Sequence, residues 1–251
     1  MRLDDDIELI DGLPVAYIRS LKAIVISDPH LGYEAAQAGR GIFLPKVNLK
    51  SITEALSKAL AATGAKTVIV NGDIKNDFST VAADEFNELY DLAAFLKVKG
   101  ASLAIVKGNH DNFVDRYRES MGLKIYAEQM AAGGYLLFHG DALPDAVPKG
   151  THTLIMGHEH PAIAVYNSVG KKEKLRCFLT GSYLGARIIV FPAIGYFSTG
   201  TEMNVVPEDE LLSPVLKRLD MGSMKAIAIG YGATMEFGTI AELRRAASLH
   251  M

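Results

Sequence analysis

The segment SLAIVKGNHD, residues 102–111, joins a short apolar run to a glycine and three polar residues. The apolar run is too short for a free-standing helix and is rich in branched aliphatic side chains, so it indicates a buried strand. Gly108 permits close approach of the backbone just beyond that strand. Asn109, His110 and Asp111 follow directly, and such a run of polar residues after a buried strand indicates a functional loop.

Four other apolar runs end in the same way. Ligands of open α/β sheets bind beyond the carboxyl ends of the strands, so we expect the five strand ends to converge. Five of the seven histidines fall at these ends, which argues against a purely structural role for the set. The remaining two, His152 and His250, are expected to be structural or surface residues. The four runs are KAIVISDPH (22–30), KTVIVNGDI (66–74), YLLFHGD (135–141) and TLIMGHEH (153–160).

The spacing of two histidine-containing motifs adds to this expectation. Residues two apart in an extended chain point to the same side. Asp28 and His30 are therefore expected to present two ligand atoms to one face, and so are His158 and His160, with Glu159 turned away. Taken singly, Asp28-Pro29-His30 and Gly72-Asp73 are more often turns, and His139 is more often a hydrogen-bonded core histidine. The GNHD and GHEH runs are moderately specific, and the joint pattern of all five motifs indicates a metal site.

The regions between the first three runs predict helices. Residues 46–64 carry an apolar face that ends at Gly64, and residues 79–100 carry another that ends at Gly100. A shorter helix is expected at 112–121. Strands that alternate with helices predict an α/β sheet in the first half of the chain.

The second half reads as successive strands with few helices, which predicts a second sheet packed on the first. Hairpins are expected around Asp11-Gly12 and at 167–174, and a strand and a last helix near the C-terminus. With no clear linker and no repeat, we expect a single domain over residues 1–251.

Composition limits the classes of function. The chain has 251 residues, 49% of them hydrophobic and 22% charged, as in an ordinary globular protein. Its net charge of −3 provides no general attraction for nucleic acid or anionic lipid. Cys177 is the only cysteine, which excludes an internal disulfide and a thiolate metal cluster. The acidic N-terminus and the lack of a membrane-length apolar run predict a cytoplasmic protein without a membrane partner.

The ordered motifs resemble the signature of the calcineurin-like metallophosphoesterases. They are Asp28-Pro29-His30, Gly72-Asp73, Gly108-Asn109-His110-Asp111, His139-Gly140 and Gly157-His158-Glu159-His160. The stretches HLGYEAAQAGRGIFLP (30–45) and GDIKNDFS (72–79) are further similar to small archaeal and bacterial SbcD-related phosphoesterases of the PdeM type. The chain lacks the Asp-Arg-Gly that follows Gly-Asp in protein phosphatases, and it has GNHD in place of GNHE. Both differences weaken an interpretation of the chain as a protein phosphatase.

The resemblance implies an αββα sandwich of two packed mixed sheets flanked by helices, with a dinuclear metal centre. It assigns Asp28, His30 and His160 to one metal, and Asp73 as a bridge to the second. It assigns the second metal to Asn109, His139 and His158, the general acid to His110, and its orienting partner to Asp111.

The expected function is that of a dinuclear-metal-dependent phosphoesterase, foremost a phosphodiesterase with nucleases included, in which a hydroxide between the metals attacks phosphorus. A phosphomonoesterase or nucleotide pyrophosphatase is the alternative. A non-catalytic metal-binding scaffold ranks lower because every motif position is filled. Oxygen and imidazole ligands without thiolate suit Mn, Fe, Zn or Co better than Cu(I), and the ligand type alone does not separate these metals. The expected cofactor is two divalent ions, Mn²⁺ first, with Fe, Zn, Co or Ni as alternatives.

The expected partner is a phosphoester substrate, with nucleic acid or a nucleotide among the candidates. The basic run Lys171, Lys172, Lys174 and Arg176 is read either as a solvated hairpin tip or as a contact for a nucleic-acid backbone. Tyr33, Glu34 and Arg40 are candidates for the rim of the pocket, and Lys75 for a cation near the phosphate. The natural substrate and the oligomeric state stay open.

Overall fold

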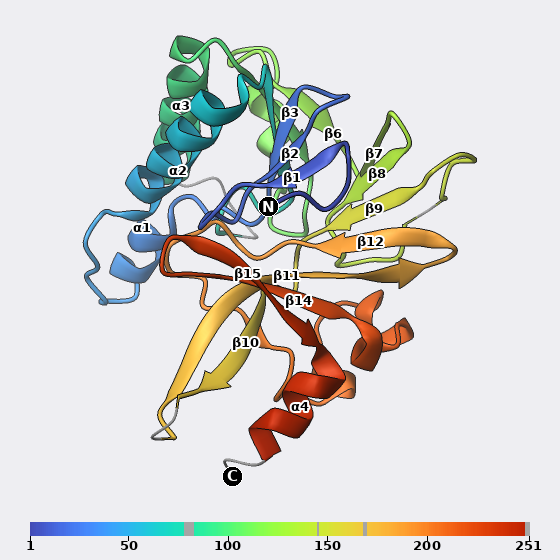
Figure 1. Cartoon of the computed structure of the whole chain (residues 1–251). Coiled ribbons are helices and arrows are strands. Elements are labelled where there is room, and N and C mark those ends of the chain that lie inside the picture. The colour runs from blue at the N-terminus through green and yellow to red at the C-terminus, as the bar shows by residue number, and fades with distance from the viewer. Residues whose placement is uncertain (78–82, 145, 168–169, 249–251) are drawn as a thin grey trace.

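A computed structural model describes residues 1–77, 83–144, 146–167 and 170–248 (Figure 1). Its first half forms a mixed sheet of six strands in the order β1-β2-β3-β4-β5-β6. The expected hairpin around Asp11-Gly12 joins β1 to β2, and β3 to β6 run parallel. The strands are β1 Ile7–Leu9, β2 Ala16–Ile18, β3 Ala23–Ile26, β4 Thr67–Asn71, β5 Ser102–Val106 and β6 Lys124–Tyr126.

Two long helices cover the outer face of this sheet. They are α2 Asn48–Thr63 and α3 Ala83–Val98, and a short helix, α1 Tyr33–Ala38, precedes them. The predicted stop of α2 is confirmed, because Gly64 caps it in a left-handed conformation with φ of 66°. The start of the helix expected at 79–100 lies partly outside the described residues. None of the described helices has both the length and the apolar composition to cross a lipid bilayer.

The prediction of a helix at 112–121 is wrong. Only a single 3₁₀ turn, Val114–Tyr117, forms there. Asp111 is held in a turn by its N–H bond to the carbonyl of Gly108, and Phe113 is left-handed with φ of 69°. The left-handed Phe113 thus interrupts the first turn of the predicted helix.

The second half forms a mixed sheet of nine strands, as the successive apolar runs predicted. Its path is β13-β10-β11-β12-β9-β8-β7, with β14 between β11 and β15. The long β11 pairs in succession with β10, β14 and β12. The strands are β7 Gln129–Ala132, β8 Tyr135–Phe138, β9 Thr153–Met156, β10 Pro161–Tyr166, β11 Lys172–Tyr183, β12 Ala186–Val190, β13 Thr201–Glu202, β14 Lys225–Gly230 and β15 Ala233–Thr239.

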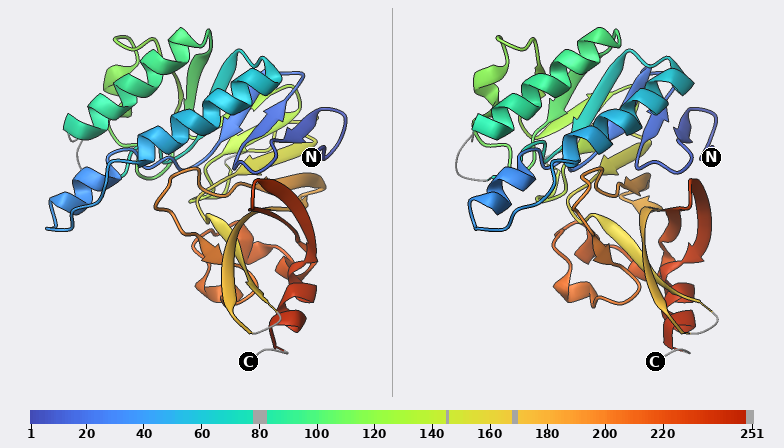
Figure 2. Two further views of the ribbon diagram at one scale, coloured as in Figure 1. Left: turned by 60° about the vertical axis from the view of Figure 1, so that its left-hand side comes forward. Right: turned by 90° about the vertical axis from the view of Figure 1, so that its left-hand side faces the viewer.

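The two sheets pack face to face, and their outer faces are covered (Figures 1 and 2). Ile69 and Val106 of the first sheet share a buried cluster with Leu137, Ile155 and Ile189 of the second. Helix α4, Ile240–Ser248, and three short 3₁₀ turns pack on the outer face of the second sheet. The expected α/β sandwich of two mixed sheets flanked by helices is confirmed, as are the last strand and helix.

Candidate metal centre

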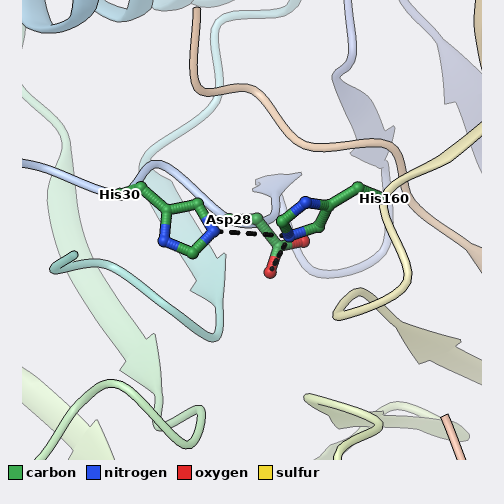
Figure 3. Close-up of side chains that lie close together, drawn as sticks. All are labelled: Asp28, His30 and His160. Carbon is green, nitrogen blue, oxygen red and sulfur yellow. Dashed lines mark hydrogen bonds and ion pairs between the residues drawn. The ribbon is translucent and has the colours of Figure 1, made fainter. Parts of the chain in front are cut away.

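The loops that follow β3, β4, β5, β8 and β9 meet at one place between the sheets. Asp28, His30 and His160 form a group whose ligand atoms all lie within 4.8 Å of one another. Asp28 Oδ1 is 3.2 Å from His160 Nε2, and His30 Nε2 is 3.4 Å from that same nitrogen. Figure 3 shows the two rings side by side at the Asp28 carboxylate.

A second group of the same compactness consists of Asp73, His139 and His158. Asp73 Oδ2 and His158 Nδ1 each lie 3.2 Å from His139 Nε2. Asp73 also forms a third group with His30 and His110, so its carboxylate lies between the first two groups. The strand ends therefore converge, and the buried His and Asp side chains are consistent with a dinuclear metal site.

The backbone at these residues differs from the expectation. Asp28, His30, Asp73, His158 and His160 all have positive φ, and they make up five of the nine described non-glycine residues with that property. The two short motifs are thus not extended chain. His158 and His160 point into different groups, whereas Asp28 and His30 share one. Strained backbone of this kind gathers at functional sites.

Burial and charge in the two groups favour bound positive charge. Burial lowers the pKa of His139, but the carboxylates of Asp73 and Asp28 outweigh this effect and raise it to about 10. Burial, together with the neighbouring His160, lowers the pKa of His30 to about 4 against the opposing effect of Asp28. Burial raises the pKa of Asp73, but His139 and the neighbouring imidazoles bring it below its usual range. The two carboxylates therefore stay ionised, and this buried negative charge favours a bound cation.

The donor atoms present also fit divalent metal ions. Asn109 Oδ1 is buried without a hydrogen-bond partner, and Asn109 follows Gly108, whose backbone packs against Asp73 and His139. Two imidazole nitrogens bound to one ion at about 2.1 Å lie roughly 3.0–3.4 Å apart, close to the 3.2 and 3.4 Å separations observed in the two groups. Cys177 is buried within β11, so the donors are oxygens and imidazoles.

His110 and Asp111 each contact the backbone of a neighbouring segment. His110 Nδ1 is 2.6 Å from the carbonyl oxygen of Asn76, and its Nε2 is 3.7 Å from Asp73 Oδ2. The Asp111 carboxylate accepts the amides of Gly108 and Lys75 at 2.8 and 3.3 Å. The Asn76 carbonyl therefore restrains the His110 ring, and Asp111 fixes the loop, while the orienting role of Asp111 stays a prediction. Burial and the charge of Asp73 raise the pKa of Asp111 to about 7.

Several other candidates have structural partners. Glu159 is turned away as expected, and its carboxylate accepts the amides of Leu212 and Ser213. Glu34 is buried and accepts the first amides of α2, whereas Arg40 is exposed. The ammonium of Lys75 donates to the carbonyl of Asp77.

The basic run is largely engaged within the fold, which favours the structural interpretation. Lys172 forms an ion pair with Glu202 at 2.6 Å, and Lys174 donates to the carbonyl of Gly200. Arg176 donates to three backbone carbonyls at residues 193–196. Residues 168–169 at the hairpin tip lie outside the described residues, as does His250. His152 is structural, with Nδ1 3.0 Å from Thr153 Oγ1.

Two structural residues were missed in the sequence. The side chain of Asn48 donates to the carbonyls of Pro29 and His30, and Asn71 donates to the carbonyls of Phe138 and Ile155 across the two sheets. Both asparagines are buried. Asn71 ends the apolar run before Gly72-Asp73, and a polar residue at such a buried position was the available signal.

Gly157→Ala is expected to disturb the site. A Cβ at Gly157 would lie 1.8 Å from Ser27 Oγ and 2.6 Å from Asp28 Oδ2, so the carboxylate must shift. We expect a loss of about 1–3 kcal/mol in the free energy of unfolding, typical of overpacking, together with weaker metal binding. Denaturant titration and metal analysis measure the two effects. Gly39→Ala is the control, because its Cβ would meet nothing closer than 3.5 Å; equal stability of the two variants would contradict the prediction.

The sequence matches the family model described as calcineurin-like phosphoesterase over residues 21–181, well over half of the chain. The structure is similar to the nuclease MPE of Pseudomonas putida, with a TM-score of 0.64 and 18% identity over 92% of this chain and 94% of that chain. The phosphoesterase YfcE of E. coli gives a TM-score of 0.41 and 18% identity over 86% of this chain and 98% of that chain. No curated protein is significantly similar in sequence.

Proposed function

The chain belongs to the calcineurin-like phosphoesterase family, and from this premise we infer that it is a phosphodiesterase that uses two divalent metal ions. The observation that carries this proposal is the pair of compact groups, Asp28-His30-His160 and Asp73-His139-His158, which lie side by side between the two sheets. Such adjacent carboxylate and imidazole groups are the arrangement that two-metal hydrolysis requires.

We propose the ligands from these two groups and from the resemblance of the motifs, on which the assignment of Asn109 rests. Asp28, His30 and His160 would hold one ion. His139, His158 and the unpartnered oxygen of Asn109 would hold the other. Asp73 shares one group with His139 and another with His30, so it is suited to contact both ions. Its negative charge would reduce the repulsion between them.

Two bound divalent ions supply charge neutralisation for the phosphoryl group and a nucleophile at neutral pH. The residues of the chain position the ions and the substrate, and they supply a proton to the leaving group. His110, with Nδ1 fixed by the carbonyl of Asn76, can present Nε2 to the leaving-group oxygen. Its imidazolium donates the proton and leaves the departing alcohol neutral. Its side chain is 17% exposed, so a substrate can reach it.

Mn²⁺ is the ion to test first, and a nucleic acid is the natural substrate class to test first. The similarity of residues 30–45 and 72–79 to SbcD-related phosphoesterases of the PdeM type motivates this choice. The Pseudomonas putida protein of similar fold is named a nuclease, and we carry that activity over only as a proposal.

The test uses protein stripped by a chelator and then reloaded with Mn²⁺. We expect two ions per chain and a gain in aryl phosphodiester hydrolysis on the order of at least 100-fold over the stripped protein. The matched aryl phosphomonoester is expected to react more slowly. Faster cleavage of the monoester would instead make the protein a phosphomonoesterase. Fewer than one ion per chain with no hydrolysis of either ester would make it a scaffold.

A further inference from the structure

The segment between β12 and β13 borders the candidate metal centre. The amide of Ile194 donates to the carbonyl of Ser27 at 2.9 Å, and that of Gly195 donates to the carbonyl of Asp28 at 3.2 Å. At its other end, the amide of Thr201 donates to the carbonyl of His160 at 3.0 Å. Residues 196–199 therefore pass from one ligand loop of the first group to the other.

Buried polar side chains fix this segment. The amide of Tyr196 donates to Asn48 Oδ1 at 2.7 Å, and Asn48 is 1% exposed. Arg176 Nη2 donates to the carbonyls of Gly195 and Tyr196 at 2.9 and 2.8 Å. A Cβ at Gly195 would lie 3.0 Å from the Pro29 carbonyl, so the segment packs closely on the ligand loop. The backbone of Tyr196 is thus held on both its N–H and C=O sides.

An aromatic cluster lies on this fixed backbone. The rings of Tyr33 and Phe197 stack with centroids 5.0 Å apart and an interplanar angle of 14°. Tyr196 meets Phe197 edge to face at 5.1 Å and is itself 54% exposed. Tyr33 is only three residues beyond the ligand candidate His30. A large exposed ring on a hydrogen-bonded backbone, with a second ring in contact with it, loses less conformational entropy than a freely mobile side chain when a planar ligand stacks on it.

We propose that Tyr196, supported by Phe197, is a stacking platform for an unpaired nucleobase next to the scissile phosphate, so that the substrate is a single-stranded nucleic acid. This inference rests on the proposed phosphodiesterase function. The net charge of −3 gives the chain no general attraction for a polyanion, and the basic residues at 172–176 have partners within the fold. Stacking supplies affinity that charge does not, and it needs bases that are not already paired in a duplex.

The test compares two diesters with the same leaving group, thymidine 5′-(p-nitrophenyl phosphate) and methyl p-nitrophenyl phosphate. Only the first carries a base. With Mn²⁺-loaded wild-type protein we expect a KM on the order of 10-fold lower for the thymidine ester. Tyr196→Ala should remove this difference while kcat for the methyl ester and the metal content stay unchanged. Tyr196→Phe should preserve it, because the stacking surface remains.

The matched control is Tyr90→Ala on α3, since Tyr90 is 55% exposed and also contacts a neighbouring ring, Phe86. It should leave the difference in KM intact. Single-stranded oligothymidine should compete with the thymidine ester better than an abasic strand of equal length, and Tyr196→Ala should abolish that preference. Equal KM values for both esters in the wild type would overturn the stacking role of Tyr196 but leave the proposed phosphodiesterase function intact. No turnover of either ester would remove the phosphodiesterase function itself.

Discussion

Asp73→Asn is expected to bind fewer than one metal ion per chain after loading with Mn²⁺ and to lose hydrolysis of aryl phosphodiesters by at least about 1,000-fold. Asp73 belongs to two of the three ligand groups, and its Oδ2 lies 3.2 Å from His139 Nε2. The neutral amide removes the negative charge between the two groups. Loss of a residue that only supports a ligand costs roughly 10- to 100-fold, so loss of the shared carboxylate should exceed that range.

Metal content by elemental analysis and the rate of hydrolysis measure this effect, with circular dichroism to show that the variant folds. Asp115→Asn is the control, because that carboxylate forms ion pairs with Lys107 and Arg118 at 2.8 Å on the surface. It should retain two ions and the wild-type rate. A folded Asp73→Asn protein with two ions and undiminished hydrolysis would refute the shared-carboxylate assignment.

His110→Ala is expected to separate proton donation from metal binding. The variant should keep both ions but lose about 10²–10⁴-fold in the hydrolysis of a diester with an alkyl leaving group. An alkoxide is a poor leaving group and needs the proton of His110, whereas p-nitrophenolate departs without one. The loss on a p-nitrophenyl diester should therefore stay below roughly 10-fold.

Rates on the two diesters and the metal content of the same protein preparation measure this separation. His152→Ala serves as the histidine control, since its ring contacts Thr153 and Tyr135 outside the three groups. His110 could instead bind a metal ion, because it shares a ligand group with His30 and Asp73. Loss of an ion together with equal loss on both diesters would make His110 a ligand instead of the proton donor.

The sequence predicted the fold and the convergence of the site because both depend on repeated local patterns. Strands β3, β4, β5, β8 and β9 consist mainly of buried apolar residues, and each is followed by polar residues in a short loop. Parallel pairing within each sheet then brings those loops together. The ligand roles came from motif resemblance, and the two compact groups support them.

The details that depend on tertiary contacts could not be predicted in the same way. His158 and His160 lie in separate groups, although their spacing suggested one face, and neither has the extended backbone that this expectation assumed. The interactions of Asn48 with Pro29, His30 and Tyr196 join residues that are 18 to 148 positions apart. No periodicity in the chain records such contacts, so Tyr196 and Phe197 were missed, although Tyr33 of the same cluster was named as a candidate for the pocket rim.

The candidate ligands come from both layers of the sandwich. Asp28, His30 and Asp73 follow strands of the first sheet, whereas His139, His158 and His160 follow strands of the second. Metal ions bound by both sets of ligands would connect the two sheets. Metal occupancy and resistance to unfolding would therefore be thermodynamically linked. A shortage of metal in the cell would then shorten the lifetime of the folded protein as well as reduce its rate of catalysis.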